Sequence, residues 1–314
     1  MFSAFPLLRL PRLVLFDVFK SLNIAEKIKL SICSKKVSTQ INNCRLYSQK
    51  VHVHLDMYSH KIEVFENGED KFKIFNRSDS GTNTDPYKQQ YQIGGCTVPV
   101  ISYPEKISAF WKNHREGFLF VIRHLLKIFQ CKFSTTINYY NNDLSQLIIS
   151  KLFDLQLEFK MLNIYPDGSN HQNWLWKQKS SNFGLVEYLT IFSIVNPAFT
   201  PVFTSWPQNV TIMDSNWFTL KYLLACTSTT ITLKGSRLGN KDVDEVLRKW
   251  KTGGFPNLQL LEIESRNITS FGATILGMNL RELNKLVIHS DDGSKKATIR
   301  HFYDRIEISV TPSE

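Results

Sequence analysis

Cysteine is scarce in this sequence, and its few copies are not arranged in pairs. The 314 residues include five cysteines, at positions 33, 44, 96, 131 and 226. Their number is odd, their spacings are wide and no C-x-x-C motif occurs, which argues against a disulfide framework and favours a reducing compartment. We therefore expect the protein in the cytoplasm, the nucleus or both.

Long apolar runs are also missing. No stretch reaches the length of about 18 apolar residues that a membrane-spanning helix requires. The uncharged segment 188–213 is interrupted by Pro197 and Pro201. The apolar N-terminus is interrupted by Arg9 and Arg12 and lacks a small-residue cleavage site, so it does not resemble a signal peptide. We expect no membrane partner.

The motifs of common catalytic sites do not occur: there is no G-x-S-x-G, H-E-x-x-H, P-loop or G-x-G-x-x-G. His52 and His54 are spaced for one strand face and could hold a metal, but no third ligand follows at a suitable spacing. Glu262 and Glu264 alternate as residues on a solvated strand face do. We expect no catalytic residue, no metal and no cofactor, and hence a protein that is not an enzyme.

The charge is unbalanced towards the basic side, with 38 Lys and Arg against 28 Asp and Glu and a net charge of +10. Nine of the basic residues lie in the first fifty positions, against Asp17 and Glu26. Such a segment suits either nucleic acid or an acidic protein. No nucleic-acid-binding motif accompanies the charge, and we therefore expect no nucleic-acid partner.

What the sequence does contain is an N-terminal segment that predicts an unusually apolar helix. After the pair Leu10-Pro11, most residues of 13–22 are apolar, and the polar ones share one narrow helical stripe. The apolar positions are Leu13, Val14, Leu15, Phe16, Val18, Phe19 and Leu22. A helix in a small bundle buries only one side, so the remaining apolar surface needs another domain or another protein.

A second helical pattern follows. Asn23 can cap it, and Glu26, three residues later, completes a capping box. Apolar positions from Ile28 to Ile41 form overlapping stripes, and four lysines are expected on the polar face, namely Lys27, Lys29, Lys35 and Lys36. Two or three short helices, one of them excessively apolar, indicate a docking module.

Residues 10–41 resemble an F-box, whose pattern is roughly LPxEILxxIFSYL followed by LSLVCKRW. The matching positions are Leu10-Pro11, Val14-Leu15, Val18-Phe19, Leu22, Leu30-Ser31-Ile32-Cys33 and Lys35-Lys36. The sequence departs from the pattern at Leu13, Ser34 and Val37. The resemblance implies docking onto the acidic Skp-type adaptor of a cullin–RING (SCF) ubiquitin ligase. The implied contact residues are Leu10, Pro11, Val14, Leu15, Val18, Phe19 and Leu22, supported by Ile28, Leu30 and Ile32.

Nearly the full chain further resembles nematode F-box proteins that carry a type 2 F-box-associated region, through stretches such as KDVDEVLRKWKTGGFPNLQLLEIE at 241–264. That resemblance implies a substrate adaptor for protein degradation, with a C-terminal region that binds a protein target. The alternative is a repeat-based interaction scaffold without a ligase role. In that case Phe16, Val18 and Phe19 would all be covered by the chain itself.

The middle of the chain changes period. Three short strands are predicted within 45–77 from alternating apolar and polar residues, with Asn67-Gly68 as a hairpin turn. A mobile loop is predicted over 77–100, which is rich in Gly, Ser, Asn and Pro, and a helix over 105–130.

From residue 134 a weak repeat places two apolar residues two positions apart. It recurs at Ile137/Tyr139, Leu162/Ile164, Leu189/Ile191, Val210/Ile212, Ile231/Leu233, Leu261/Ile263, Leu286/Ile288 and Ile306/Ile308. The spacing, 20 to 30 residues, predicts parallel strands joined by crossovers, as in leucine-rich repeats. The Asn or Cys ladder of such repeats is mostly absent, so an irregular stack is expected.

We therefore predict an α/β protein, α+β overall. It has a helical F-box over 5–44, a short β-meander with its loop and helix over 45–130, and a leucine-rich-repeat-like strand–helix stack over 131–310. Outward positions on that stack are candidate substrate contacts, namely Tyr140, Tyr165, Phe192, Met213, Lys234, Glu262 and Glu264. Alternatively, the loops at 166–183 and 196–208 cover these aromatic residues.

Overall fold

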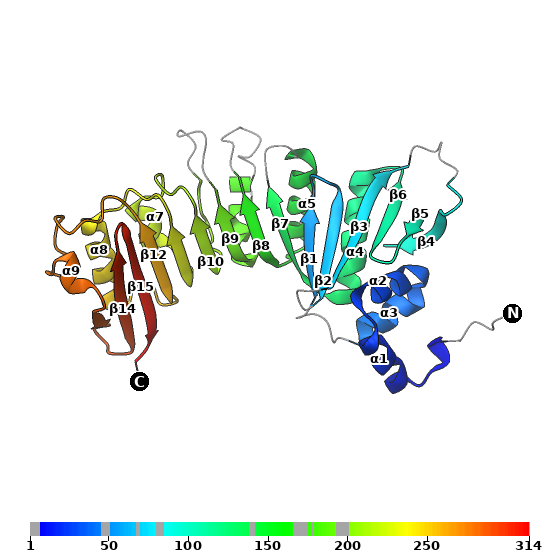
Figure 1. The fold of residues 1–314 in the computed structure, drawn as a ribbon, viewed down its shortest axis with the longest axis horizontal. Coiled ribbons are helices and arrows are strands. Elements are labelled where there is room, and N and C mark those ends of the chain that lie inside the picture. Colours follow the sequence, from blue (N-terminus) through cyan, green and yellow to red (C-terminus); the bar gives the residue numbers. More distant parts are fainter. Residues whose placement is uncertain are drawn as a thin grey trace. The chain divides into compact units, whose positions relative to one another are not determined.

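The computed structural model describes residues 7–44, 51–66, 70–79, 85–137, 142–165, 175–176, 179–192 and 201–313. The chain forms two compact units, which are treated separately below. The N-terminal unit is Met1–Thr135, and the C-terminal unit is Thr136–Glu314. Both combine helices with a mixed sheet, so the α+β class predicted from the sequence is confirmed (Figure 1).

The N-terminal unit begins with a short 3₁₀ turn, η1 (Leu7–Arg9), and three helices, α1 (Arg12–Ser21), α2 (Ile24–Cys33) and α3 (Lys35–Asn43) (Figure 1). The capping box at the start of α2 is confirmed: the Glu26 N–H donates to Asn23 Oδ1, and the Asn23 N–H donates to Glu26 Oε2, both at 2.9 Å. The apolar stripes predicted as one helix up to Ile41 are divided at Ser34, whose extended backbone ends α2 and precedes α3.

The sheet of this unit has the strand order β7-β1-β2-β3-β6-β5-β4. The three strands predicted within 45–77 are confirmed as β1 (Val51–Asp56), β2 (Lys61–Glu66) and β3 (Asp70–Ser78). Strands β2 and β3 pair antiparallel, as a hairpin requires, although its predicted turn at Asn67-Gly68 lies outside the described residues. Strand β7 (Lys132–Ile137) pairs in parallel with β1 through residues 132–135.

Two predictions for residues 77–130 are wrong. The end of the predicted loop forms β4 (Gln89–Ile93) and the start of β5 (Cys96–Ser102), an antiparallel pair that turns at Gly94-Gly95. The predicted helix over 105–130 starts with strand β6 (Lys106–Trp111), and only then does α4 (His114–Phe129) begin. The strand alternates buried and exposed residues, and the Asn113 side chain, which accepts from two N–H groups of the first turn, starts the helix.

Helices α2 and α4 both pack on this sheet, and α2 does so through a lysine that the sequence placed on the polar face. Lys27 is 1% exposed, and its Nζ lies 2.9 Å from Glu66 Oε1 of β2. One turn later, Ser31 Oγ lies 2.8 Å from Nε2 of His124 on α4. The expectation that Lys27 is solvated is therefore wrong, because its charge is neutralised by a carboxylate in the core.

The C-terminal unit has the strand order β8-β9-β10-β11-β12-β15-β14-β13. Its first five strands are parallel and follow one another in the sequence: β8 (Phe159–Ile164), β9 (Val186–Ile191), β10 (Asn209–Ile212), β11 (Thr230–Leu233) and β12 (Leu260–Glu264). Around them lie α5 (Asn142–Asp154), η4 (Ser180–Leu185), α7 (Leu220–Ala225) and α8 (Asn240–Lys251). The predicted repeat is in register, since buried residues of successive strands pair from Leu162 to Leu261.

The parallel arrangement does not continue to the end of the chain. After α9 (Leu280–Leu283), strands β13 (Val287–His289), β14 (Lys295–Phe302) and β15 (Arg305–Pro312) are antiparallel, and β15 pairs antiparallel with β12. The repeats predicted at Leu286/Ile288 and Ile306/Ile308 therefore fall at strands, but the parallel direction predicted for them is wrong. Short turns at Gly293 and Tyr303, both with positive φ, join these strands, whereas a parallel connection needs a crossover of a dozen or more residues.

The buried ion pair predicts a large loss of stability when one partner is removed. Lys27→Ala leaves the Glu66 carboxylate buried without its cation, so we expect the unfolding free energy of the N-terminal unit to fall by about 3–5 kcal/mol in urea denaturation. The matched control is Lys20→Ala, because Lys20 and Asp17 form a pair whose side chains are 52% and 75% exposed. That change is expected to cost less than about 1 kcal/mol. Equal effects of the two substitutions would contradict the role assigned to Lys27.

Candidate functional site

Helix α1 presents an apolar surface that the chain does not cover. Of its ten residues only Leu15 and Phe19 are buried, one turn apart on the face that packs inward. On the outer side Leu13 is 77% exposed and Val14 46% exposed. Leu8, in the preceding 3₁₀ turn, is also exposed. The excess apolar surface predicted for this helix is therefore present.

The predicted adaptor contacts divide into two groups. Those at the surface or partly covered are Leu10, Pro11, Val14, Val18, Leu22 and Leu30. Those buried inside the unit are Leu15, Phe19, Ile28 and Ile32. The buried group holds the helices together and cannot contact a partner in this conformation.

Two exposed apolar residues, Leu8 and Leu13, were not among the predicted contacts. Leu13 counted as a departure from the motif because an acid is common at that position. The sequence did contain a signal for Leu13, because the helix is apolar around most of its circumference. Leu13 lies next to the narrow polar stripe and still belongs to that apolar surface.

The charges around the exposed apolar residues are mainly positive. Arg9 and Arg12 are exposed beside them, and the Arg12 guanidinium lies 5.2 Å from the centre of the Phe16 ring. Lys20 is partly neutralised by Asp17, with Nζ and Oδ1 3.5 Å apart. An apolar patch with a basic rim suits a protein partner with an acidic surface.

A second candidate surface lies on the parallel strands of the C-terminal unit. Backbone hydrogen bonds extend the parallel ladder by one residue past the strand ends: the Phe192 N–H donates to the Ile164 carbonyl at 2.9 Å, and the Met213 N–H to the Ile191 carbonyl at 2.8 Å. These bonds bring one residue from each strand to the same level. The resulting row, called the outer row below, is Tyr165, Phe192, Met213, Lys234 and Glu264.

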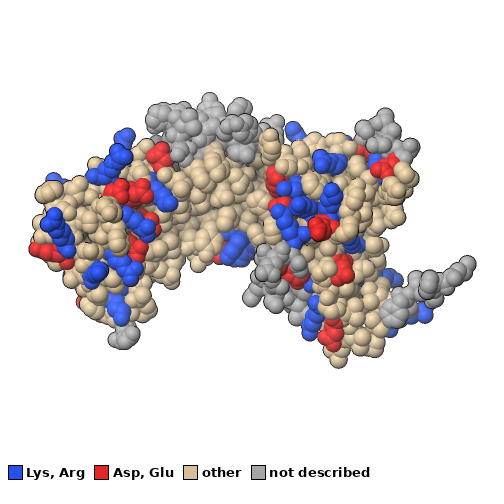
Figure 2. All heavy atoms as spheres, viewed as in Figure 1, with Lys and Arg blue, Asp and Glu red and all other residues tan. Residues whose placement is uncertain are grey.

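The apolar end of the outer row is solvent-accessible. Tyr165 and Met213 are 39% and 36% exposed, and Phe192 is half-buried because the Tyr165 ring stacks on it, with ring centroids 3.9 Å apart and planes within 6°. Figure 2 shows that the face over β8–β10 is largely free of charged side chains. The predicted contact Tyr140 lies outside the described residues, as do parts of the loops 166–183 and 196–208.

The polar end of the predicted substrate surface is partly occupied by its own neighbours. Glu262 accepts a hydrogen bond from Arg305 at 2.9 Å, and Arg305 also binds Glu307 at 3.1 Å. Lys234, Glu262 and Glu264 are all half-buried. The Glu262 carboxylate is thus held by the adjacent antiparallel strand, which leaves Lys234 and Glu264 as the polar members of the outer row.

A third surface is the outer face of β1–β3, where Lys and Arg gather (Figure 2). Lys61 and Lys71 both bind Glu63, at 3.0 and 2.7 Å. Burial raises the pKa of Glu63, but the hydrogen bonds and charges of these two lysines outweigh that effect and lower the pKa below its usual range.

The titratable groups in the described ranges are candidate metal ligands, which need to gather around one point. No cluster of three or more His, Cys, Asp or Glu side chains able to hold a metal occurs there. His52, a candidate ligand, has its Nε2 2.6 Å from Ser134 Oγ. Burial lowers the pKa of His54, and it raises the pKa of the Cys131 thiol to about 12.

None of the helices in the described part of the chain combines the length and the apolar character that a membrane crossing requires.

Comparison with known families finds one matching segment in each unit. Residues 7–49 match the model of the F-box domain, and residues 202–263 match an F-box-associated family. No curated protein and no solved structure matched the chain. The first match contains η1 and α1–α3, and the second contains β10, β11 and β12 with α7 and α8. The chain therefore carries an F-box domain in its N-terminal unit and an F-box-associated region in its C-terminal unit.

Proposed function

We propose that this protein is the substrate-recognition subunit of an SCF-type cullin–RING ubiquitin ligase. Its F-box docks onto a Skp-type adaptor, and its C-terminal unit binds the protein to be modified and degraded. The observation that carries the proposal is the exposed apolar surface of α1 within the segment that matches the F-box domain. Its contact residues are Leu8, Leu10, Pro11, Leu13, Val14, Val18 and Leu22.

In this role the protein makes and breaks no covalent bonds. It holds a target beside the conjugating enzyme that the ligase recruits, which raises the effective concentration of the target's lysines. The basic residues around α1 favour approach of an acidic adaptor surface and affect the rate of association more than the final affinity. The cytoplasm and the nucleus are the compartments in which we place this activity.

For the target-binding surface, we take the outer row of a leucine-rich-repeat-like stack. Its aromatic and apolar members, Tyr165, Phe192 and Met213, belong to residue types that are enriched in protein interfaces. Lys234 and Glu264 add charged groups at one end, where they contribute to the choice of target.

A scaffold without a ligase role is the competing function. It requires that Phe16, Val18 and Phe19 all be covered within the chain. Only Phe19 is buried, whereas Phe16 and Val18 are half-buried and Leu13 is mostly exposed. The exposure of α1 favours the adaptor function.

The first prediction separates docking from folding. Leu8→Asp combined with Val14→Asp places two acidic groups on the exposed apolar surface that we propose faces an acidic partner, since Leu8 and Val14 are 42% and 46% exposed. We expect co-purification with the Skp-type adaptor to fall by at least about 30-fold, since interface anchors contribute about 2 kcal/mol or more. The thermal unfolding midpoint is expected to stay within error.

Two further variants sharpen this comparison. Asn43→Asp, an exposed change at the end of α3, is expected to retain adaptor binding. Phe19→Ala is expected to weaken binding only through a loss of stability of about 3–5 kcal/mol, because Phe19 is fully buried. Full adaptor binding by the Leu8/Val14 variant would refute the docking surface.

The second prediction concerns the target. Tyr165→Ser, Phe192→Ser and Met213→Ser together remove the apolar end of the outer row. We expect the variant to lose protein targets that the wild type captures in affinity purification with mass spectrometry, while adaptor binding is unchanged. The matched control is Phe271→Ser with Tyr303→Ser, since both rings are 96% exposed in the same unit. If the triple variant captures the same targets as the control, the outer row is not the recognition surface.

A further inference from the structure

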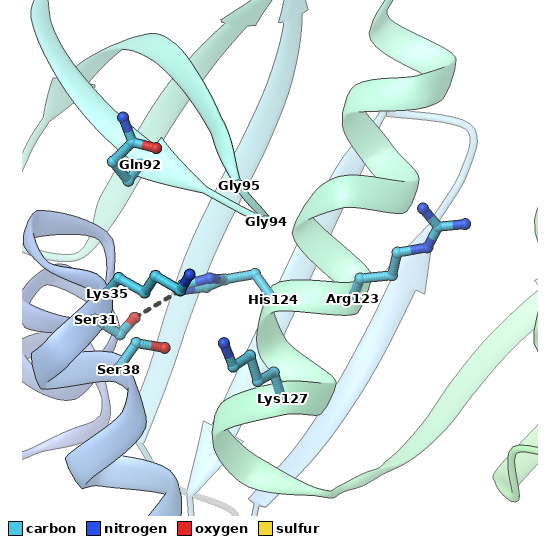
Figure 3. A pocket seen from close by; sticks show the side chains of 9 residues that line it. All are labelled: Ser31, Lys35, Ser38, Gln92, Gly94, Gly95, Arg123, His124 and Lys127. Atoms are coloured by element: carbon cyan, nitrogen blue, oxygen red, sulfur yellow. Dashed lines mark hydrogen bonds between the residues drawn. The ribbon is translucent and has the colours of Figure 1, made fainter.

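The N-terminal unit contains a pocket of about 430 Å³ that neither the adaptor surface nor the outer row uses. Its walls come from the end of α2, the first turns of α3, the turn between β4 and β5, and α4 (Figure 3). Residues more than ninety positions apart, from Ser31 to Lys127, thus meet around one cavity.

The side chains that line the pocket carry positive charge without a matching negative one. Lys35 of α3 and Lys127 of α4 extend into it, whereas the Arg123 guanidinium turns away (Figure 3). No Asp or Glu is among the lining residues. Within the described residues, neither lysine forms an ion pair or a side-chain hydrogen bond. Lys35 and Lys127 are both exposed residues, and their ammonium groups lie on different walls of the cavity. Two such groups together attract a ligand with more than one negative charge.

A hydroxyl in the same pocket is available to a ligand. Ser38 is 3% exposed as a whole residue, and it lines the pocket. Figure 3 shows this hydroxyl directed into the cavity, on the same side as the Lys127 ammonium. A serine hydroxyl can both donate and accept a hydrogen bond, so Ser38 can donate to an anionic ligand in the pocket.

Two neutral side chains, Ser31 and His124, also line the pocket. Ser31 Oγ donates its single proton to the Ile28 carbonyl at 2.6 Å, so at 2.8 Å it accepts from Nε2–H of His124. Burial, together with the charge of Lys127, lowers the pKa of His124 to about 4, so the ring is neutral at physiological pH. The positive charge of the pocket therefore comes from its basic residues and not from the histidine.

The turn at Gly94-Gly95 keeps the mouth of the pocket open. Both glycines have positive φ, at 60° and 93°, and a Cβ on Gly94 would lie 2.8 Å from the Phe120 carbonyl oxygen of α4. The close approach of the hairpin to α4 thus requires glycine. The two residues add backbone but no side chain to the lining, which leaves room for a ligand.

We propose that this pocket binds a phosphate monoester through Lys35, Lys127 and Ser38. A phosphate monoester offers a tetrahedral dianion with several acceptor oxygens, which two ammonium groups and one hydroxyl can satisfy together. The ester is either that of a phosphorylated serine in a protein or that of a small phosphorylated molecule. Because the ligand bridges α3 and α4, its binding stabilises the attachment of the F-box helices to the sheet. The proposal does not depend on ubiquitin-ligase function.

The test uses the full chain in phosphate-free buffer, with isothermal titration calorimetry and thermal unfolding as the readouts. The probes are inorganic phosphate, O-phosphoserine, serine, and a peptide with and without one phosphoserine. We expect saturable binding and a raised unfolding midpoint with inorganic phosphate, O-phosphoserine and the phosphopeptide. We expect neither effect with serine or the unphosphorylated peptide. Tighter binding of the phosphopeptide than of O-phosphoserine assigns the site to a protein ligand, and the reverse assigns it to a small molecule.

Three variants test the residues. Lys35→Gln with Lys127→Gln is expected to weaken binding by at least about tenfold through the loss of charge-assisted hydrogen bonds. Lys36→Gln with Lys112→Gln changes the net charge equally at two exposed lysines outside the pocket and is expected to bind as the wild type does. Ser38→Ala is expected to weaken binding, because it removes the hydroxyl that donates to the ligand. Absence of saturable binding to every phosphorylated probe, or equal binding by the two double-lysine variants, would overturn the proposal.

Discussion

The buried contact between Lys27 and Glu66 sets the orientation of the F-box helices on the sheet of the N-terminal unit. A lysine that is 1% exposed is tolerated only where a carboxylate meets it, and Glu66 Oε1 lies 2.9 Å from its Nζ. Because Lys27 must reach this carboxylate, the face of α2 that carries Lys27 packs against the sheet. Ser31 follows one turn later on that face and reaches His124 of α4. Lys35 and Ser38 follow on α3, after the break at Ser34, and line the pocket that we propose binds phosphate.

With α2 oriented in this way, α1 is left to cover the bundle with only Leu15 and Phe19. Its remaining apolar residues are half-buried or exposed, and Leu13 is the most exposed of them at 77%. The same helix therefore has a buried face and an exposed apolar face, and the exposed one is the proposed docking face. Substitutions on the buried face are expected to reduce stability, and those on the exposed face to reduce affinity for the adaptor.

In the C-terminal unit the controlling constraint is register. Each parallel strand contributes only a few residues, and the outer row, our proposed recognition surface, arises because equivalent residues of β8–β12 lie at one level. A shift of one residue in any strand would move Phe192 or Met213 to the buried face. The buried partners Leu162, Leu189, Val210, Ile231 and Leu261 prevent such a shift, so the core of this unit also determines the composition of its surface.

Local sequence was sufficient wherever an element is stabilised by its own residues. The capping box of Asn23 and Glu26 marked the start of α2, alternation marked β1–β3, and the repeated apolar pairs marked β8–β12 and the side on which Tyr165 and Met213 lie. The F-box motif was visible for the same reason, because its positions are contiguous. What tertiary structure alone decided depends on contacts between distant residues. Lys27 is buried because Glu66 lies on a strand that no helical period reveals, and β15 runs antiparallel because short turns leave no length for a crossover. The pocket of Lys35, Ser38 and Lys127 exists only after four elements have packed, since no spacing along the chain brings these side chains together.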